Sequence, residues 1–335
     1  MILFRPFVLA SFSLIGRIVA YRLSAVRCWG AVLVVTSVIP IPRLSFGEET
    51  RFQKDIQTIK NGHVEMGFDM TRGGAICRFA TSRKEMNVIN QFDHGRFIQQ
   101  SYYGDRDGSK WMDKPWRWNP VQGGSCNGKS SKVISAEFSP TKCKVVTRPT
   151  HWATGEEISD AEMSTEASLD GNVAHLVYRF AYSGDQQFKA THQELPAVFA
   201  DESLSTLVFY GGDSPWKHGE LKRVVPGWPN RSYDISEQWA AYVNEGDWGL
   251  GVYSPRMKHI TCYRFPQDGK DEPKGNACSY FAPIENFAIG PNFVFEYEVW
   301  LTIGTVDEMR KSFDRIRQNE SVVTSADATA KGSRK

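Results

Sequence analysis

Two residues on a predicted strand, His192 and Glu194, form a pair that is suited to proton transfer. In an extended chain alternate side chains share one face, so THQELPAVF puts His192 and Glu194 on one side and Thr191 and Gln193 on the other. A histidine beside a carboxyl group suits general acid–base catalysis. The alternative is that Glu194 only forms an ion pair with a nearby arginine.

A second candidate is the stretch from Asn87 to Tyr103, NVINQFDHGRFIQQSYY, which is dense in hydrogen-bonding and aromatic side chains. Hydroxyl-rich ligands need directional polar partners and aromatic platforms, and this stretch supplies both. His94 is a further candidate for proton transfer. The predicted binding residues are Asp93, Arg96, Gln100, Tyr102 and Tyr103. A polar surface loop is the alternative, although such loops are also where functional groups concentrate.

The next segment, WMDKPWRWNPVQGG, brings tryptophans close to amide side chains. Trp116 and Trp118 could stack on a ligand while Asn119 and Gln122 form hydrogen bonds to it. Equally, the tryptophans could cover a sheet edge, since large aromatic residues are mostly buried.

The segment ISEQWAAYVNEGDWGLGVYSP predicts a hairpin that carries a second carboxyl group. Glu237 and Trp239 share one face of its first strand, and the small Ala241 leaves space over the indole. Glu237 could therefore act with Glu194 as a catalytic pair, and Trp239 could bind a ligand. Alternatively, Trp239 fills the core.

From Asn61 onward, short runs of β-branched and aromatic residues alternate with turn residues, which predicts many strands. Without intervening helices this pattern favours an all-β fold, a large antiparallel β-sandwich in one domain over residues 48–318. Thr305 and Glu308 form a capping box ahead of one C-terminal helix whose apolar face is Val306, Met309, Phe313 and Ile316. The polar composition of residues 319–335 predicts a disordered tail.

Residues 1–47 are basic and apolar, which predicts a signal peptide or an uncleaved N-terminal anchor and a secreted or periplasmic protein. Removing them takes away five of the 40 basic residues and none of the 38 acidic ones, so the net charge becomes −3. There is therefore no excess of basic residues that would indicate nucleic acid as a partner. Contact with a membrane is expected only through an uncleaved anchor.

The remaining cysteines do not have the spacing of a zinc motif, and export would permit disulfides. The pairs Cys126 with Cys143, and Cys262 with Cys278, are the first candidates. The sequence lacks a Gly-rich phosphate loop, a G-x-S-x-G elbow and an H-E-x-x-H motif. We therefore expect no cofactor and no metal.

The chain resembles secreted bacterial proteins of the galactose mutarotase-like, carbohydrate-active superfamily. The motifs that carry the resemblance are GGAI, NVIN with DHGRFIQQSYY, WNPVQGG, QELPAVF, and EQWAAYVN with GLGVYSP, within residues 62–304. It implies a β-supersandwich with a sugar in a cleft on the concave face of a sheet. Mutarotases use a mid-chain His as acid and a late Glu as base, which here could be His192 with Glu285, Glu296 or Glu298.

Four functions follow as hypotheses, all with an oligo- or polysaccharide as partner. The leading hypothesis is a glycoside hydrolase, which would use Glu194 and Glu237 on either side of the scissile bond, with Asp93 in reserve. A polysaccharide lyase would neutralise a uronate with Arg96 or a Gln and remove a proton with His94 or Tyr103. A non-catalytic carbohydrate-binding protein would need only the aromatic platforms, and a sugar epimerase is the fourth.

Overall fold

The computed structural model describes residues 55–83, 86–91, 96–265 and 277–332, with side chains up to residue 319. The predicted N-terminal leader therefore lies outside the described residues, and so do Asp93 and His94. Export and the roles of these two residues remain predictions.

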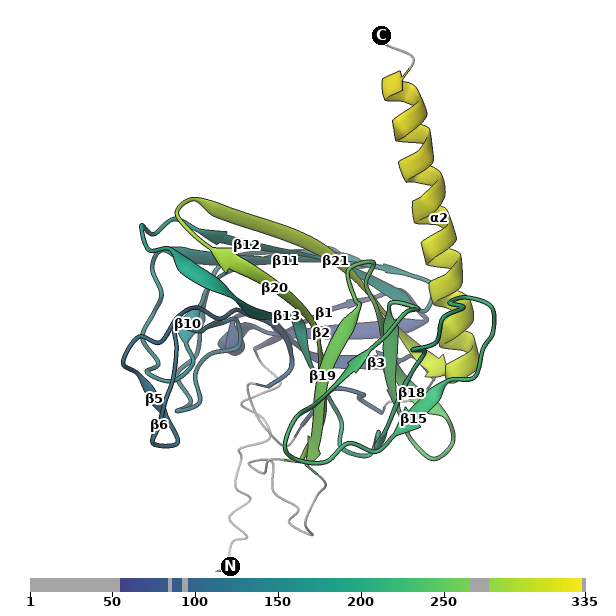
Figure 1. Ribbon diagram of the computed structural model, residues 1–335, viewed down its shortest axis with the longest axis horizontal. Coiled ribbons are helices and arrows are strands. Elements are labelled where there is room, and N and C mark those ends of the chain that lie inside the picture. The colour runs from purple at the N-terminus through teal and green to yellow at the C-terminus, as the bar shows by residue number, and fades with distance from the viewer. Residues whose placement is uncertain (1–54, 84–85, 92–95, 266–276, 333–335) are drawn as a thin grey trace, which may run out of the picture. The chain divides into compact units, whose positions relative to one another are not determined.

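Two large antiparallel sheets form the described part of the chain (Figure 1). The first sheet runs in the order β1 (Ile56–Lys60), β2 (Val64–Asp69), β3 (Ala75–Thr81), β4 (Ile98–Ser101), β13 (Phe188–Ala200), β20 (Cys278–Ile289), β19 (His259–Phe265) and β16 (Arg231–Asp234), with β7 (Pro120–Val121) and β10 (Thr150–His151) attached beside β4. The second runs in the order β15 (Lys222–Val224), β14 (Thr206–Phe209), β17 (Trp239–Val243), β18 (Trp248–Tyr253), β21 (Phe293–Thr305), β12 (Val173–Tyr182), β11 (Ala161–Asp170), β9 (Lys142–Arg148) and β8 (Lys132–Phe138).

Three further elements lie outside these two sheets. They are η1 (Met70–Arg72), the β5 (Lys110–Trp111) and β6 (Lys114–Pro115) hairpin, and the helix α2 (Val306–Gly332). Figure 1 shows the hairpin and α2 at opposite ends of the sheets. The all-β prediction with one C-terminal helix is confirmed.

The main core lies between the two sheets and follows from alternation along their strands. On β21, Phe293, Phe295, Tyr297 and Val299 face this core, as their period of two predicts. The neighbouring strand β12 in the same sheet pairs with β21 in unbroken register from Val173 opposite Thr302 to Tyr182 opposite Phe293. Because one face of each strand is buried, this register is strongly specified.

β13 is the strand on which the polar face of the first sheet depends. Its pairing with β20 is regular at Glu194 opposite Ile284 and resumes at Val198 opposite Phe281, with a bulge between them. A bulge inserts extra residues on one strand and so reverses which side chains face outward. Glu194 and Phe199 therefore lie on the same face of β13, the face that points away from the main core, although one residue number is even and the other is odd.

The capping box predicted for α2 is present. The Glu308 carboxylate accepts hydrogen bonds from the Thr305 backbone N–H at 2.8 Å and from its hydroxyl at 2.9 Å. The backbone hydrogen bond, the hydroxyl hydrogen bond and the charge of Lys311, in this order, hold the pKa of Glu308 below its usual value. The helix continues to Gly332, beyond Gln318, because extending a nucleated helix costs little. Disorder of residues 319–335 concerns motion and stays a prediction.

α2 packs on the face of the second sheet that points away from the main core. Met309 and Phe313 are buried there against Trp239, and the ring of Phe313 lies 6.0 Å from that indole. The space that the small alanines leave over Trp239 is thus filled by the helix. Trp239 is a core residue, and its prediction as a ligand-binding residue is wrong.

Glu237 lies under the same helix. Its carboxylate is fully buried and accepts hydrogen bonds from Arg310 Nε at 2.9 Å, from the Trp239 indole at 3.0 Å and from the Trp216 backbone at 2.8 Å. A buried carboxylate that is fully paired holds the helix on the sheet and has no room for a substrate. The prediction of Glu237 as a catalytic residue is wrong.

Neither predicted disulfide fits the structure. Cys126 is exposed in a loop, whereas Cys143 is buried on β9, and both are free thiols. On β19 and β20, Cys262 lies opposite Phe281 and Cys278 lies opposite Phe265, so these two cysteines are out of register. Burial raises the pKa of Cys262 to about 12, and of Cys143 likewise.

No helix within the described ranges has the length and apolar character needed to span a bilayer.

Breaking the Glu237–Arg310 pair should destabilise the fold. Replacing Arg310 by Met leaves a buried carboxylate without its cation, and we expect a loss of about 3–5 kcal/mol in the free energy of unfolding. Urea unfolding followed by tryptophan fluorescence measures this loss. The control is Lys311→Met, an exposed residue on the next position of the same helix. Equal stability of the two variants would contradict the role given to this pair.

Candidate functional site

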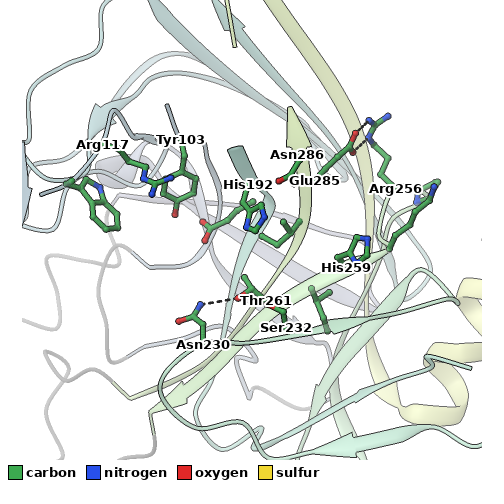
Figure 2. A pocket seen from close by; sticks show the side chains of 16 residues that line it. Tyr103, Arg117, His192, Asn230, Ser232, Arg256, His259, Thr261, Glu285 and Asn286 are labelled. Carbon is green, nitrogen blue, oxygen red and sulfur yellow. Dashed lines mark hydrogen bonds and ion pairs between the residues drawn. The ribbon is translucent and has the colours of Figure 1, made fainter. Parts of the chain in front are cut away.

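A cleft of about 930 Å³ lies on the face of the first sheet that points away from the main core. Figure 2 shows Tyr103 and Arg117 at one end of it, and Arg256 and His259 at the other. The cleft is lined by Tyr103, Trp116, Arg117, His192, Glu194, Asn230, Ser232, Pro255, Arg256, Lys258, His259, Ile260, Thr261, Ile284, Glu285 and Asn286. Its floor is thus built from β13, β20, β19 and β16, which are consecutive in the sheet.

Glu194 is the carboxyl group at the floor of this cleft. It accepts a hydrogen bond from the Tyr280 hydroxyl on β20, and hydroxyls of Tyr103 and Ser101 reach it from the β4 side. Burial raises the pKa of Glu194 above its usual value, and this effect outweighs the hydrogen bonds and the charge of Arg96, which lower it. A carboxyl group with a raised pKa can exchange protons closer to neutral pH.

Tyr103 is held in place by the residue next to Glu194. Gln193 points to the other face of β13, where its side chain accepts a hydrogen bond from Tyr103 N–H at 2.7 Å and donates one to Tyr103 C=O at 2.9 Å. Burial raises the pKa of the Tyr103 hydroxyl well above its usual value, and the charge of Glu194 adds to this. Tyr103 therefore keeps its proton next to the carboxyl group.

The walls of the cleft carry several cationic groups. Arg117 donates to the Thr191 hydroxyl at 3.2 Å and lies 6.0 Å from the Tyr103 ring. Arg256 forms a bidentate ion pair with Glu285, drawn in Figure 2. Lys258 lies at the same end of the cleft. Among the described lining residues, Glu194 and Glu285 are the carboxyl groups, and Glu285 is neutralised by its arginine.

Four of the predicted site residues come together in this cleft. His192 and Glu194 line it from one strand, which confirms that they share a face, and Tyr103 and Trp116 line it from the β4 side. The Trp116 indole donates a hydrogen bond to Asn119 at 3.2 Å, so its ring is held at the rim.

The predicted amide ligands are wrong because their side chains are buried and donate hydrogen bonds to backbone carbonyl groups. Gln100 donates to Ser164 C=O at 2.9 Å, Gln122 donates to Gly73 C=O at 3.1 Å, and Asn119 donates to Tyr102 C=O at 2.7 Å. Tyr102 is also fully buried and stacks on Phe180 with 4.1 Å between ring centroids. These side chains form hydrogen bonds with backbone groups at places where the strands are irregular. Buried polar groups need such hydrogen-bond partners.

Trp118 and Arg96 lie near the cleft without lining it. Trp118 stacks on Phe188 at 4.3 Å and packs against the main core. Its role is therefore structural, in line with the alternative to ligand binding given above. Arg96 lies over the Trp152 ring at 5.1 Å and donates to the Tyr263 hydroxyl at 3.4 Å. Its charge lowers the pKa of Glu194, so it acts on the site without lining the cleft.

Sequence patterns did not indicate the cleft residues on β16 and β19, nor Ile284 and Asn286 on β20. Alternation in HITCYRF places His259, Thr261 and Tyr263 on one face, which was a usable signal. The pairing of this strand with β20 and β16 could not be predicted from its alternation pattern. Of the late carboxylates, Glu285 borders the cleft, whereas Glu298 pairs with His175 at 2.6 Å on the second sheet. Among the described residues no three His, Cys, Asp or Glu side chains are arranged to hold a metal ion.

Neither a protein-family model nor a curated protein matches the sequence. Similar solved structures include a galactose mutarotase related enzyme from Lactobacillus acidophilus, with 9% identity over 74% of this chain and 97% of that chain and a TM-score of 0.48. A galactose mutarotase-like protein from Lactobacillus casei has 9% identity over 74% and 99%, with a TM-score of 0.46. The polysaccharide lyase BACCELL_00875 has 13% identity over 77% of this chain and 35% of its own, with a TM-score of 0.44.

The all-β sandwich is established by the two antiparallel sheets of the chain itself. Galactose mutarotase-like proteins, which the sequence resembles, are among the structures similar to it. A fold does not fix a reaction.

The raised pKa of Glu194 has a consequence for stability. Since the folded protein binds this proton more tightly than the unfolded chain, the ionised group destabilises the fold. Wild type should therefore lose stability relative to Glu194→Gln as pH rises from the unfolded pKa, about 4.3, through the folded pKa. Urea unfolding of both proteins between pH 4 and pH 8 measures the difference. A difference that is constant, or that favours wild type at higher pH, would contradict the raised pKa.

Proposed function

We propose that the cleft binds an acidic oligo- or polysaccharide and that Glu194 transfers a proton to or from it. The observation that supports this most is the placement of Glu194, a half-buried carboxyl group with a raised pKa, on the floor of an open polar cleft. Amide, hydroxyl and imidazole groups around it suit sugar hydroxyls, and the Trp116 ring suits a sugar face.

The charge of the cleft favours a carboxylated sugar. Arg117 and Lys258 have no carboxylate partner among the described ion pairs, while Glu285 is matched by Arg256. Arg117 lies on the Tyr103 side of Glu194, where it would neutralise a uronate. Guanidinium groups bind carboxylates by paired hydrogen bonds, which would also orient the sugar.

Elimination is the reaction that these groups support best. Glu194, ionised, would take the proton from the ring carbon next to the uronate carboxylate. The electrons of that C–H bond would form a double bond to the neighbouring carbon, and the bond from that carbon to the glycosidic oxygen would break. Tyr103 holds its proton and would donate it to the leaving oxygen.

The described residues give less support to the hydrolase hypothesis. Hydrolysis needs two carboxyl groups on either side of the scissile bond. Glu237 lies under α2, and Glu285 is held by Arg256. A glycosidase using Glu194 and Glu237 is therefore not proposed.

Export of the protein is a further part of the proposal, supported only by the composition of residues 1–47. A secreted or periplasmic location would bring the cleft into contact with extracellular polysaccharides.

Replacing Glu194 by Gln should lower turnover by about 10²–10⁴-fold, because it removes the proton acceptor, while binding changes only a few-fold. Tyr103→Phe should also lower turnover, because it removes the proton donor. The assay follows the ultraviolet absorbance of the unsaturated uronate formed from pectate, alginate and other acidic polysaccharides.

The matched control is Glu166→Gln, since Glu166 is an exposed carboxylate paired with Lys144 on the second sheet. It should retain wild-type turnover. New reducing ends without ultraviolet absorbance would contradict elimination. Binding without any turnover would identify a carbohydrate-binding protein instead.

A further inference from the structure

Trp228 is a large aromatic residue that lies beside the cleft and is not explained by the core. Its side chain is 60% exposed, although tryptophan is usually well buried. Two rings hold it in place: Phe265 stacks on it at 5.3 Å, and Tyr263 meets it edge-on at 5.4 Å. An exposed indole fixed by its neighbours can bind a ligand without losing much side-chain entropy.

Trp228 is connected to the cleft through the chain and through the sheet. Asn230, two residues later, lines the cleft and donates to the Thr261 hydroxyl at 3.1 Å. The ring of Tyr263 lies 4.6 Å from that of Tyr280, whose hydroxyl binds Glu194. Trp228, Tyr263, Tyr280 and Glu194 therefore follow one another along the same face of the first sheet.

Trp116 lies on the other side of Glu194. It borders the cleft next to Arg117, whose guanidinium lies near the Tyr103 ring, and Tyr103 follows β4. Since the sheet order is β4, β13, β20, β19 and β16, the strand that carries Glu194 separates Trp116 from Trp228. Two indoles thus flank the carboxyl group.

The distance between these positions decides the size of the ligand. The indole of Trp228 contacts Phe265 and Tyr263 of β19, and from β13 to β19 there are two strand spacings, roughly 10 Å. A single sugar ring is too small to touch both Glu194 and Trp228. An oligosaccharide laid across the strands would reach both.

From this arrangement we infer that the cleft binds an oligosaccharide chain across β13, β20 and β19, with one unit on Trp116, one over Glu194 and one on Trp228. The inference rests on the proposed function. It adds that the reaction takes place within a chain and that Trp228 determines the preference for long substrates. Aromatic stacking suits the C–H faces of successive sugar units.

The test measures affinity against chain length. The probes are oligogalacturonates and oligomannuronates from disaccharide to octasaccharide, titrated calorimetrically into Glu194→Gln protein, which should not consume them. Affinity should rise with length. Adding Trp228→Ala should weaken the longest oligomers by about tenfold and leave disaccharides unchanged, while Trp228→Phe should restore most of the loss.

Val225→Ala is the matched control, because Val225 is an exposed apolar residue, 61% exposed, in the same loop and outside the aromatic contacts. This variant should bind the oligosaccharides with the same affinity as the Glu194→Gln protein. If affinity rises with length but Trp228→Ala leaves the profile unchanged, the inference is overturned and the proposed function stands. If no oligosaccharide binds the parent protein, both are overturned.

Discussion

The pairing of β13 with β20 is the constraint on which the site depends. It fixes the register at which Glu194 lies opposite Ile284, and it brings Tyr280 within hydrogen-bonding distance of the carboxyl group. The same strand turns Gln193 inward, where it holds the backbone of Tyr103. Two adjacent residues thus have two roles: Glu194 is the reactive group, and Gln193 holds Tyr103 beside it. Preorganised sites require such support.

The bulge between Glu194 and Val198 gives this strand its second role. Beyond the bulge, Phe199 joins Tyr263 and Tyr280 on the outer face. A polar floor and an aromatic surface therefore adjoin on one sheet. This combination leaves the Glu194 carboxyl group half-buried, raises its pKa through desolvation, and leaves ring faces beside it. The proposed chemistry and the proposed length of the ligand have this common origin.

Local patterns in the sequence were sufficient where the signal was periodic. The capping box at Thr305, the alternation along β21 and the shared face of His192 and Glu194 all depend on neighbours a few residues away. They could be predicted because backbone geometry alone sets which side chains share a face.

The remaining residues depend on contacts distant in sequence. Gln100 and Gln122 are as polar as cleft residues, but their partners are Ser164 and Gly73, which only the tertiary fold brings near. Glu237 is neutralised by an arginine on α2, 73 residues later. Polarity by itself does not distinguish a side chain that binds a ligand from one that satisfies buried backbone. This is why part of the predicted cleft proved to be core.

The most direct measurement is a crystal structure of Glu194→Gln protein with a hexauronate bound. We expect a sugar chain lying across β13, β20 and β19, with a uronate unit next to residue 194, its carboxylate at Arg117 and Tyr103 close to the glycosidic oxygen. A chain bound on another face of the molecule, or one that leaves residue 194 without a sugar contact, would contradict the central claim that this carboxyl group acts on an acidic glycan.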